Sequence, residues 1–156
     1  MPKILVAGIG NVFLSDDAFG VEVAAILLRR QYPEQVTVGD FGIRGFDLAY
    51  ALMGDYDLAI LVDALPRGEP PGTLYIFEPD ASQASGAVEG HAMNPMAVFS
   101  LVAALGGRMP RVLIVGCEPQ SVDEGMGLSE PVAAALQGAV EMVENLVKQE
   151  EAAWVG

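Results

Sequence analysis

Asp17, Asp63 and His91 are the residues whose types and positions best suit chemistry. Asp63 ends the apolar run from Leu58 to Val62, Asp17 follows a glycine turn, and His91 is the only histidine of the chain. Two carboxylates and one imidazole form a hard and incomplete coordination set that leaves positions open for further ligands. The relative affinities of different metals for such ligands do not by themselves identify which metal would bind.

Each of these residues also has a purely structural interpretation. Asp63 could cap the turn that follows it, because aspartate side chains commonly bond to backbone amides in turns. Asp16 and Asp17 stand together before a predicted helix, where one of them would suffice as the N-cap and the second could point at a ligand. His91 could be an incidental loop histidine, although histidine titrates near neutrality and is the commonest metal ligand.

The elements that must position these side chains alternate along the chain, and the pattern predicts an α/β fold. Short apolar runs bounded by turn residues predict buried strands, at Ile4–Ala7, Val36–Val38, Leu58–Val62 and Val112–Val115. Helical spacing and start signals predict four helices, which begin near Phe19, cover Phe46–Met53 and Met96–Leu105, and open at Ser129-Glu130-Pro131. The expected architecture has three layers, with a mainly parallel twisted sheet of about five strands between helices on both faces.

Two further segments complete this expectation. Thr73–Phe77 follows the previous strand with too few residues for a crossover helix, so it is expected to pair antiparallel at an edge. Pro79 to Gly90 lacks periodicity and is expected to be a loop. In such sheets ligands bind beyond the carboxyl ends of the strands, so the loops that bear Asp17, Asp63 and His91 could converge there.

The composition bounds the class of protein. A chain of 156 residues is expected to form one domain over 1–156, and 52% hydrophobic residues exclude intrinsic disorder. A net charge of −13 argues against nucleic acid and anionic membranes as partners, because both are bound through Lys and Arg. No stretch resembles a membrane span or a signal peptide, and the single cysteine permits no intrachain disulfide, so a cytoplasmic location is expected.

Two other chemistries have partial signals. The Gly8-Ile9-Gly10 turn after the first strand suggests dinucleotide binding, but Phe13 occupies the place of the third glycine, and acids at the helix start would repel phosphate. Cys117 could be a nucleophile with His91 as its base, but the neighbouring Glu118 should raise the pKa of the thiol. A buried structural thiol is the better interpretation.

At this point several segments resemble the nickel-iron hydrogenase maturation endopeptidases. The resemblance lies in the run from Gly8 to Asp17, in Leu61-Val62-Asp63-Ala64, and in Gly90-His91 ahead of a helix. Val115-Gly116-Cys117-Glu118-Pro119 and Gly127-Leu128-Ser129 also fit that family. The resemblance covers the chain from Lys3 to about Val147.

The resemblance implies an aspartic-type endopeptidase that removes a carboxy-terminal extension from a hydrogenase large-subunit precursor after nickel insertion. It implies a twisted sheet between helices, in agreement with the residue pattern. It also implies that Asp17, Asp63 and His91 form the site and bind metal, with the nickel carried by the precursor and not necessarily retained by the enzyme. The alternative from another class is a non-catalytic α/β module that binds a small ligand or nucleotide at the Gly8-Ile9-Gly10 turn.

The sequence departs from the family pattern at two places. Asp17 stands where relatives often carry glutamate, which shortens the reach of the carboxylate by one methylene. Gly42-Ile43-Arg44-Gly45 stands where many relatives have a glycine- and threonine-rich turn. Arg44 could be a charge partner for the substrate tail or for Asp63, or a solvated turn arginine.

Overall fold

The computed structural model describes residues 1–80 and 94–155, and within them five strands form one sheet of order β2-β1-β3-β5-β4. The strands are β1 (Ile4–Ile9), β2 (Val36–Gly42), β3 (Leu58–Ala64), β4 (Leu74–Phe77) and β5 (Arg111–Cys117). Neighbours pair in parallel except β4, which lies antiparallel to β5 at one edge. The predicted α/β class and the antiparallel edge strand are both confirmed.

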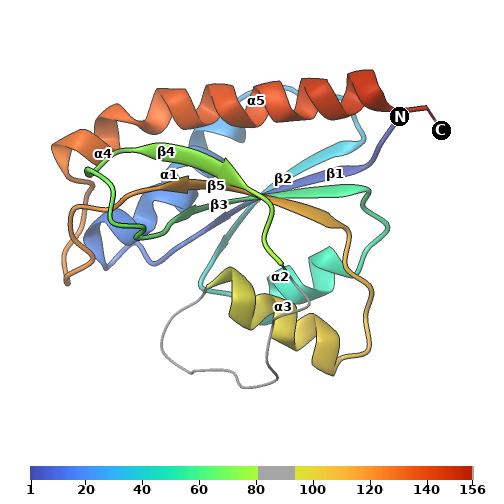
Figure 1. Ribbon diagram of the computed structural model, residues 1–156, viewed down its shortest axis with the longest axis horizontal. Coiled ribbons are helices and arrows are strands. Elements are labelled where there is room, and N and C mark those ends of the chain that lie inside the picture. The colour runs from blue at the N-terminus through green and yellow to red at the C-terminus, as the bar shows by residue number, and fades with distance from the viewer. Residues whose placement is uncertain (81–93, 156) are drawn as a thin grey trace.

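Helices cover both faces of the sheet, which gives the three predicted layers (Figure 1). The helices α1 (Phe19–Leu27) and α5 (Leu136–Ala153) lie on one face, and α2 (Gly45–Leu52) and α3 (Pro95–Ala104) lie on the other. Two short elements, the 3-10 helix η1 (Ser15–Ala18) and α4 (Glu130–Ala134), precede α1 and α5. Apolar side chains of β1 and β3 alternate between the two faces, so each face contributes to its own core.

The strands that lead to the site extend further than the apolar runs predict. β1 continues through Gly8 and Ile9, and β3 includes Asp63 and Ala64. Backbone pairing with neighbouring strands continues past the predicted runs, for example between Gly8 and Asp40 and between Asp63 and Gly116, and this lengthens both strands. The last predicted helix is divided in two at Ala135. The loop predicted from Pro79 to Gly90 lies almost wholly outside the described residues.

Asn94 is the N-cap of α3, and Asn followed by Pro is a typical helix start. Its side-chain Oδ1 accepts a hydrogen bond of 2.9 Å from the Ala97 amide, and Pro95 occupies the first helical position. This cap fixes where α3 starts, beside the carboxyl end of β3, and Asn94 itself lines the cavity described below.

The distance between α1 and the sheet is set by glycines. A Cβ at Gly20, in the first turn of α1, would lie 2.0 Å from the Val62 carbonyl oxygen and 2.4 Å from that of Ile9. A Cβ at Gly8, on β1, would lie 2.2 Å from the Gly20 carbonyl oxygen. Only glycine therefore lets the start of α1 rest directly on the backbones of β1 and β3. Gly20 follows Asp17 by three residues and Val62 immediately precedes Asp63, so this contact lies close in sequence to both acids.

Within the described residues, no helix combines the length and apolar character needed to cross a bilayer.

We expect Gly20→Ala to destabilise the protein by about 1–3 kcal/mol, the cost of forcing extra atoms into a packed contact. The contact is with backbone atoms, which cannot move aside as a side chain does. Urea unfolding monitored by circular dichroism measures the change. Gly138→Ala, in α5, is the matched control: its Cβ would meet only the far end of the Leu74 side chain, so the change should be neutral or stabilising. An equal effect of both substitutions would contradict the glycine contact.

Candidate functional site

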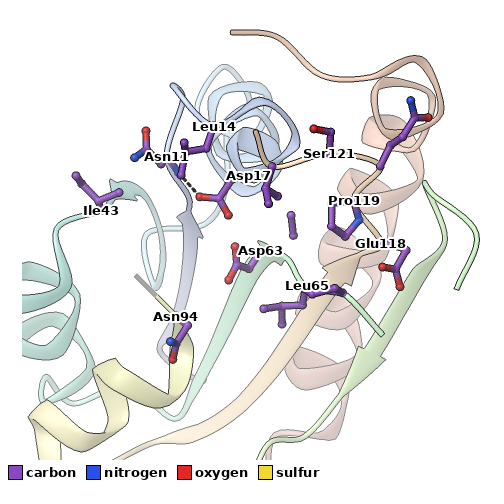
Figure 2. Close-up of a pocket in the computed structure, with 14 residues that line it drawn as sticks. Asn11, Leu14, Asp17, Ile43, Asp63, Leu65, Asn94, Glu118, Pro119 and Ser121 are labelled. Carbon is purple, nitrogen blue, oxygen red and sulfur yellow. Dashed lines mark hydrogen bonds between the residues drawn. The ribbon is translucent and has the colours of Figure 1, made fainter. Parts of the chain in front are cut away.

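Asp17 and Asp63 face one cavity of about 440 Å³ beyond the carboxyl ends of the parallel strands. Figure 2 shows the two carboxylates directed toward one another, with Ile43 and Asn11 on one side and Pro119 and Glu118 on the other. The cavity walls come from the loops that follow β1, β2, β3 and β5 and from the start of α3. The position agrees with the rule that ligands of parallel sheets bind past the strand ends.

Asp63 is buried without a full set of partners. Only 2% of its surface is exposed, and its Oδ1 has no hydrogen-bond partner among the described residues. Burial raises the pKa of Asp63 well above its ordinary value, the negative charge of Asp17 raises it further, and a backbone hydrogen bond at Ala64 opposes both. Asp63 lies within β3 and lines the cavity, so the interpretation as a simple turn cap does not describe it.

Asp17 is half-buried and held by the glycine turn. The Asn11 amide donates a hydrogen bond of 2.8 Å to its Oδ2. Burial raises the pKa of Asp17, and the hydrogen bond from Asn11 partly offsets that rise. Two neighbouring carboxyl groups with raised pKa values form a site where negative charge is costly, so a cation between them would be favoured electrostatically.

Asp16 is not the N-cap that the sequence suggests. Among the described residues neither η1 nor α1 has a side-chain N-cap hydrogen bond. The fully buried Asp16 instead accepts bonds from the amides of Gln120 (2.8 Å), Ser121 (3.1 Å) and Ser129 (2.7 Å), and from the Ser129 hydroxyl (2.9 Å). Burial alone would raise the pKa of Asp16, but these hydrogen bonds outweigh it and lower the pKa. Asp16 therefore holds the segment 120–129 in place, and Gln120, Ser121 and Val122 at its start line the cavity.

Glu118 fastens a second wall. Its Oε1 accepts hydrogen bonds from the amides of Arg67 (2.7 Å) and Glu69 (2.9 Å), and so it fixes the loop after β3 that brings Leu65 and Pro66 to the cavity. The Tyr75 hydroxyl donates to the Leu65 carbonyl from the edge strand. The sequence shows Glu118 as a polar residue at a strand end, but it gives no signal for these distant partners.

His91 lies outside the described residues, so the structure brings together two of the three predicted site residues. Asn94, three positions later in the sequence, lines the same cavity. Within the described part of the chain, no group of three or more His, Cys, Asp or Glu side chains is arranged to hold a metal ion. The described residues thus offer two carboxylates toward a metal, Asp17 and Asp63.

Arg44 stabilises a turn and does not contact Asp63. The Arg44 guanidinium donates to the carbonyls of Asp40 and Phe41 and pairs with Asp47 at 3.3 Å, so it holds the turn after β2 and does not pair with Asp63.

Cys117 is buried, and burial together with the charges of Asp16 and Glu118 raises the pKa of its thiol to about 12. The thiol is protonated at neutral pH, which confirms the effect predicted for Glu118 and disfavours a nucleophilic role.

The glycine turn is not arranged for a phosphate. The Gly10 amide donates to the Gly42 carbonyl at 3.0 Å, and the Asn11 amide is bonded to Asp17. A phosphate at a helix start needs such amides free, and here it would also approach two acids.

We expect Asp63→Asn to stabilise the protein at neutral pH. The folded state holds the Asp63 proton more tightly than the unfolded chain, in which aspartates have a pKa of about 3.9. Stability is therefore lost as the pH rises above that value toward the raised pKa of the folded state. The gain from Asp63→Asn should vanish in acid and grow toward neutrality, as measured by urea unfolding of metal-free protein at several pH values.

The neighbouring Asp16→Asn should have the opposite effect. Its pKa is lowered in the folded protein, so its contribution is present above the unfolded value and lost as the pH falls through the folded one. A loss of about 2 kcal/mol or more at neutral pH is expected, because the amide cannot accept all four hydrogen bonds. If Asp63→Asn were destabilising at neutral pH, the unsatisfied Oδ1 of the buried Asp63 carboxylate would be contradicted.

Comparison with known proteins places this arrangement in one family. The profile described as HycI, hydrogenase maturation protease, matches residues 21–146. The chain is 30% identical over 145 residues to the hydrogenase 2 maturation protease of Escherichia coli, covering 90% of this chain and 88% of that protein. It is 35% identical over 145 residues to the hydrogenase expression/formation protein HoxM of Azotobacter vinelandii, covering 89% and 69%.

Solved structures of relatives share the fold. The hydrogenase maturating endopeptidase HybD from E. coli superposes with a TM-score of 0.78 at 27% identity, over 95% of this chain and 93% of that chain. A [NiFe] hydrogenase maturation protease HycI from Thermococcus kodakarensis superposes with a TM-score of 0.71 at 26% identity, over 94% and 93%. The protein is therefore a peptidase and belongs to the hydrogenase maturation protease family.

Proposed function

We propose that this peptidase removes the carboxy-terminal extension of a nickel-iron hydrogenase large-subunit precursor after nickel has been inserted. Asp17, Asp63 and His91 recognise the nickel that the precursor carries and form the aspartic-type active site. The observation that carries the proposal is the buried Asp63 carboxylate, whose Oδ1 has no partner among the described residues and which faces Asp17 across the cavity.

The two carboxylates favour a metal that arrives with the substrate. Burial and mutual repulsion make the ionised pair costly, and a divalent cation placed between the carboxylates would offset both effects. Two oxygen ligands with one imidazole leave coordination positions open. A nickel ion already held by the precursor could fill those positions with its own ligands, so that docking reports whether the metal is loaded.

His91 is included in the proposed site because of the resemblance of the sequence to the family. His91 precedes Asn94, which lines the cavity, by three positions in the sequence. The imidazole supplies a third ligand of the type that binds nickel readily.

The cavity walls position the scissile segment. Asp16 holds residues 120–129 and Glu118 holds the loop at 65–69, so the carboxylates are presented between two fixed walls. A metal next to the scissile peptide would polarise its carbonyl or lower the pKa of a water molecule. Recognition of the loaded nickel is the primary role of the two acids.

Cleavage of nickel-loaded and nickel-free precursor by the purified protein tests this function. We expect only the loaded precursor to be shortened, and we expect Asp17→Asn, Asp63→Asn and His91→Ala each to lower the rate at least about 100-fold, as for removal of one group that acts at the reacting centre. Gel electrophoresis and mass spectrometry of the product measure the cleavage.

The controls separate a damaged site from a damaged fold. Circular dichroism should show each variant folded. Asp47 is exposed and pairs with Arg44, and Asp47→Asn should keep the wild-type rate. Equal cleavage of loaded and nickel-free precursor would contradict nickel recognition. An unchanged rate in a folded variant would remove that residue from the proposed site.

A further inference from the structure

A second recess adjoins the cavity on the side of β2. It encloses about 230 Å³ and shares Asn11 and Ile43 with the main cavity, so the two spaces are neighbours across one common wall. Small-molecule sites usually enclose about 300–1,000 Å³, so a space of this size suits a single side chain better than a whole ligand.

A β-bulge in β2, where its pairing with β1 shifts register, lies next to the recess. Gly8 pairs with Asp40, but Ile9 pairs with Gly42, so β2 contains one extra residue at Phe41. Bulges of this kind redirect a strand and are common next to active sites. The backbone then turns at Gly42, whose φ is +54°, and presents Ile43 beside the recess.

The residues that line the recess are mostly apolar, and two of them are largely exposed to solvent. Val12, Phe13, Val21 and Ile43 line the recess, with Asp40 as the charged residue in its lining. Phe13 is 64% exposed and Ile43 is 61% exposed. Large apolar side chains that are exposed around a concave space commonly mark an interaction site.

We propose that this recess is a specificity subsite that seats one apolar side chain of the precursor, a few residues from the scissile bond. This inference rests on the proposed cleavage at the Asp17–Asp63 cavity, because the shared wall at Asn11 and Ile43 makes the two spaces consecutive along a bound chain. An apolar side chain buried against Phe13 and Val12 supplies the anchor that such interfaces depend on.

The surroundings argue against other ways of binding at this place. An added strand on the free side of β2 is blocked near the recess, because Arg44 already occupies the carbonyls of Asp40 and Phe41. A phosphate would meet the Asp40 carboxylate and the occupied amides of Gly10 and Asn11. Insertion of a side chain needs neither a free strand edge nor free amides.

Phe13→Ala tests the subsite without disturbing the loop. The Phe13 amide and carbonyl are bonded to Asn11 and Gly125, and the substitution leaves both of these backbone hydrogen bonds in place. For cleavage of the nickel-loaded precursor we expect about a tenfold rise in KM with kcat unchanged, and partial recovery in Phe13→Leu. Tyr50→Ala on α2 is the matched control, since Tyr50 is 63% exposed and lines neither space, and its KM should equal that of the wild type.

A paired experiment identifies the occupant. Each apolar residue of the precursor within four positions of the scissile bond is changed to Ser, and we expect one such change to raise the KM of the wild-type enzyme about tenfold while adding little to Phe13→Ala. An unchanged KM in Phe13→Ala would overturn the subsite. So would a full additional rise in KM on top of Phe13→Ala for the Ser change at every precursor position. So would a change in sedimentation of Phe13→Ala alone, which would show that a second copy of the chain covers the recess. If nickel-free precursor proved equally good as a substrate, nickel recognition would fail while the KM comparison would still report on the subsite.

Discussion

The burial of Asp63 beside a second carboxylate is the constraint on which the rest of the site depends. A buried carboxylate with one unsatisfied oxygen is unfavourable, and the charge of Asp17 makes it more so. The fold maintains it through contacts that hold both acids at the cavity. Asp63 stands within β3 and pairs with Gly116 of β5. Asp17 accepts a hydrogen bond from the Asn11 backbone amide, just before a helix that rests on the sheet through Gly20.

The adjacent acids Asp16 and Asp17 show how neighbouring residues of one type acquire different roles. In η1 they point in different directions, so Asp16 is buried among donors and Asp17 faces the cavity. Hydrogen bonds lower the pKa of one, and burial raises the pKa of the other. One carboxylate therefore secures the wall of the site, and the other remains available to a ligand.

The sequence was sufficient to predict the fold and part of the candidate site. The features that it did not predict depend on contacts between residues far apart in the chain. The buried strands and the Asn94 cap depend on local patterns, and Asp63 stands out because it interrupts an apolar run. The partners of Asp16 are 104 to 113 residues away, and those of Glu118 are 49 and 51 residues away, so no local pattern could reveal them. The role of Ile43 depends on the bulge in β2, which only the pairing with β1 makes visible.

X-ray absorption at the nickel edge tests most directly whether the acid pair meets the metal of the precursor. The spectrum of loaded precursor should change when the wild-type protein is added, with additional oxygen ligands at distances typical of a carboxylate. The change should be absent with Asp63→Asn even when the complex still forms. An identical nickel environment in the free precursor and in its complex with active wild-type protein would contradict the account.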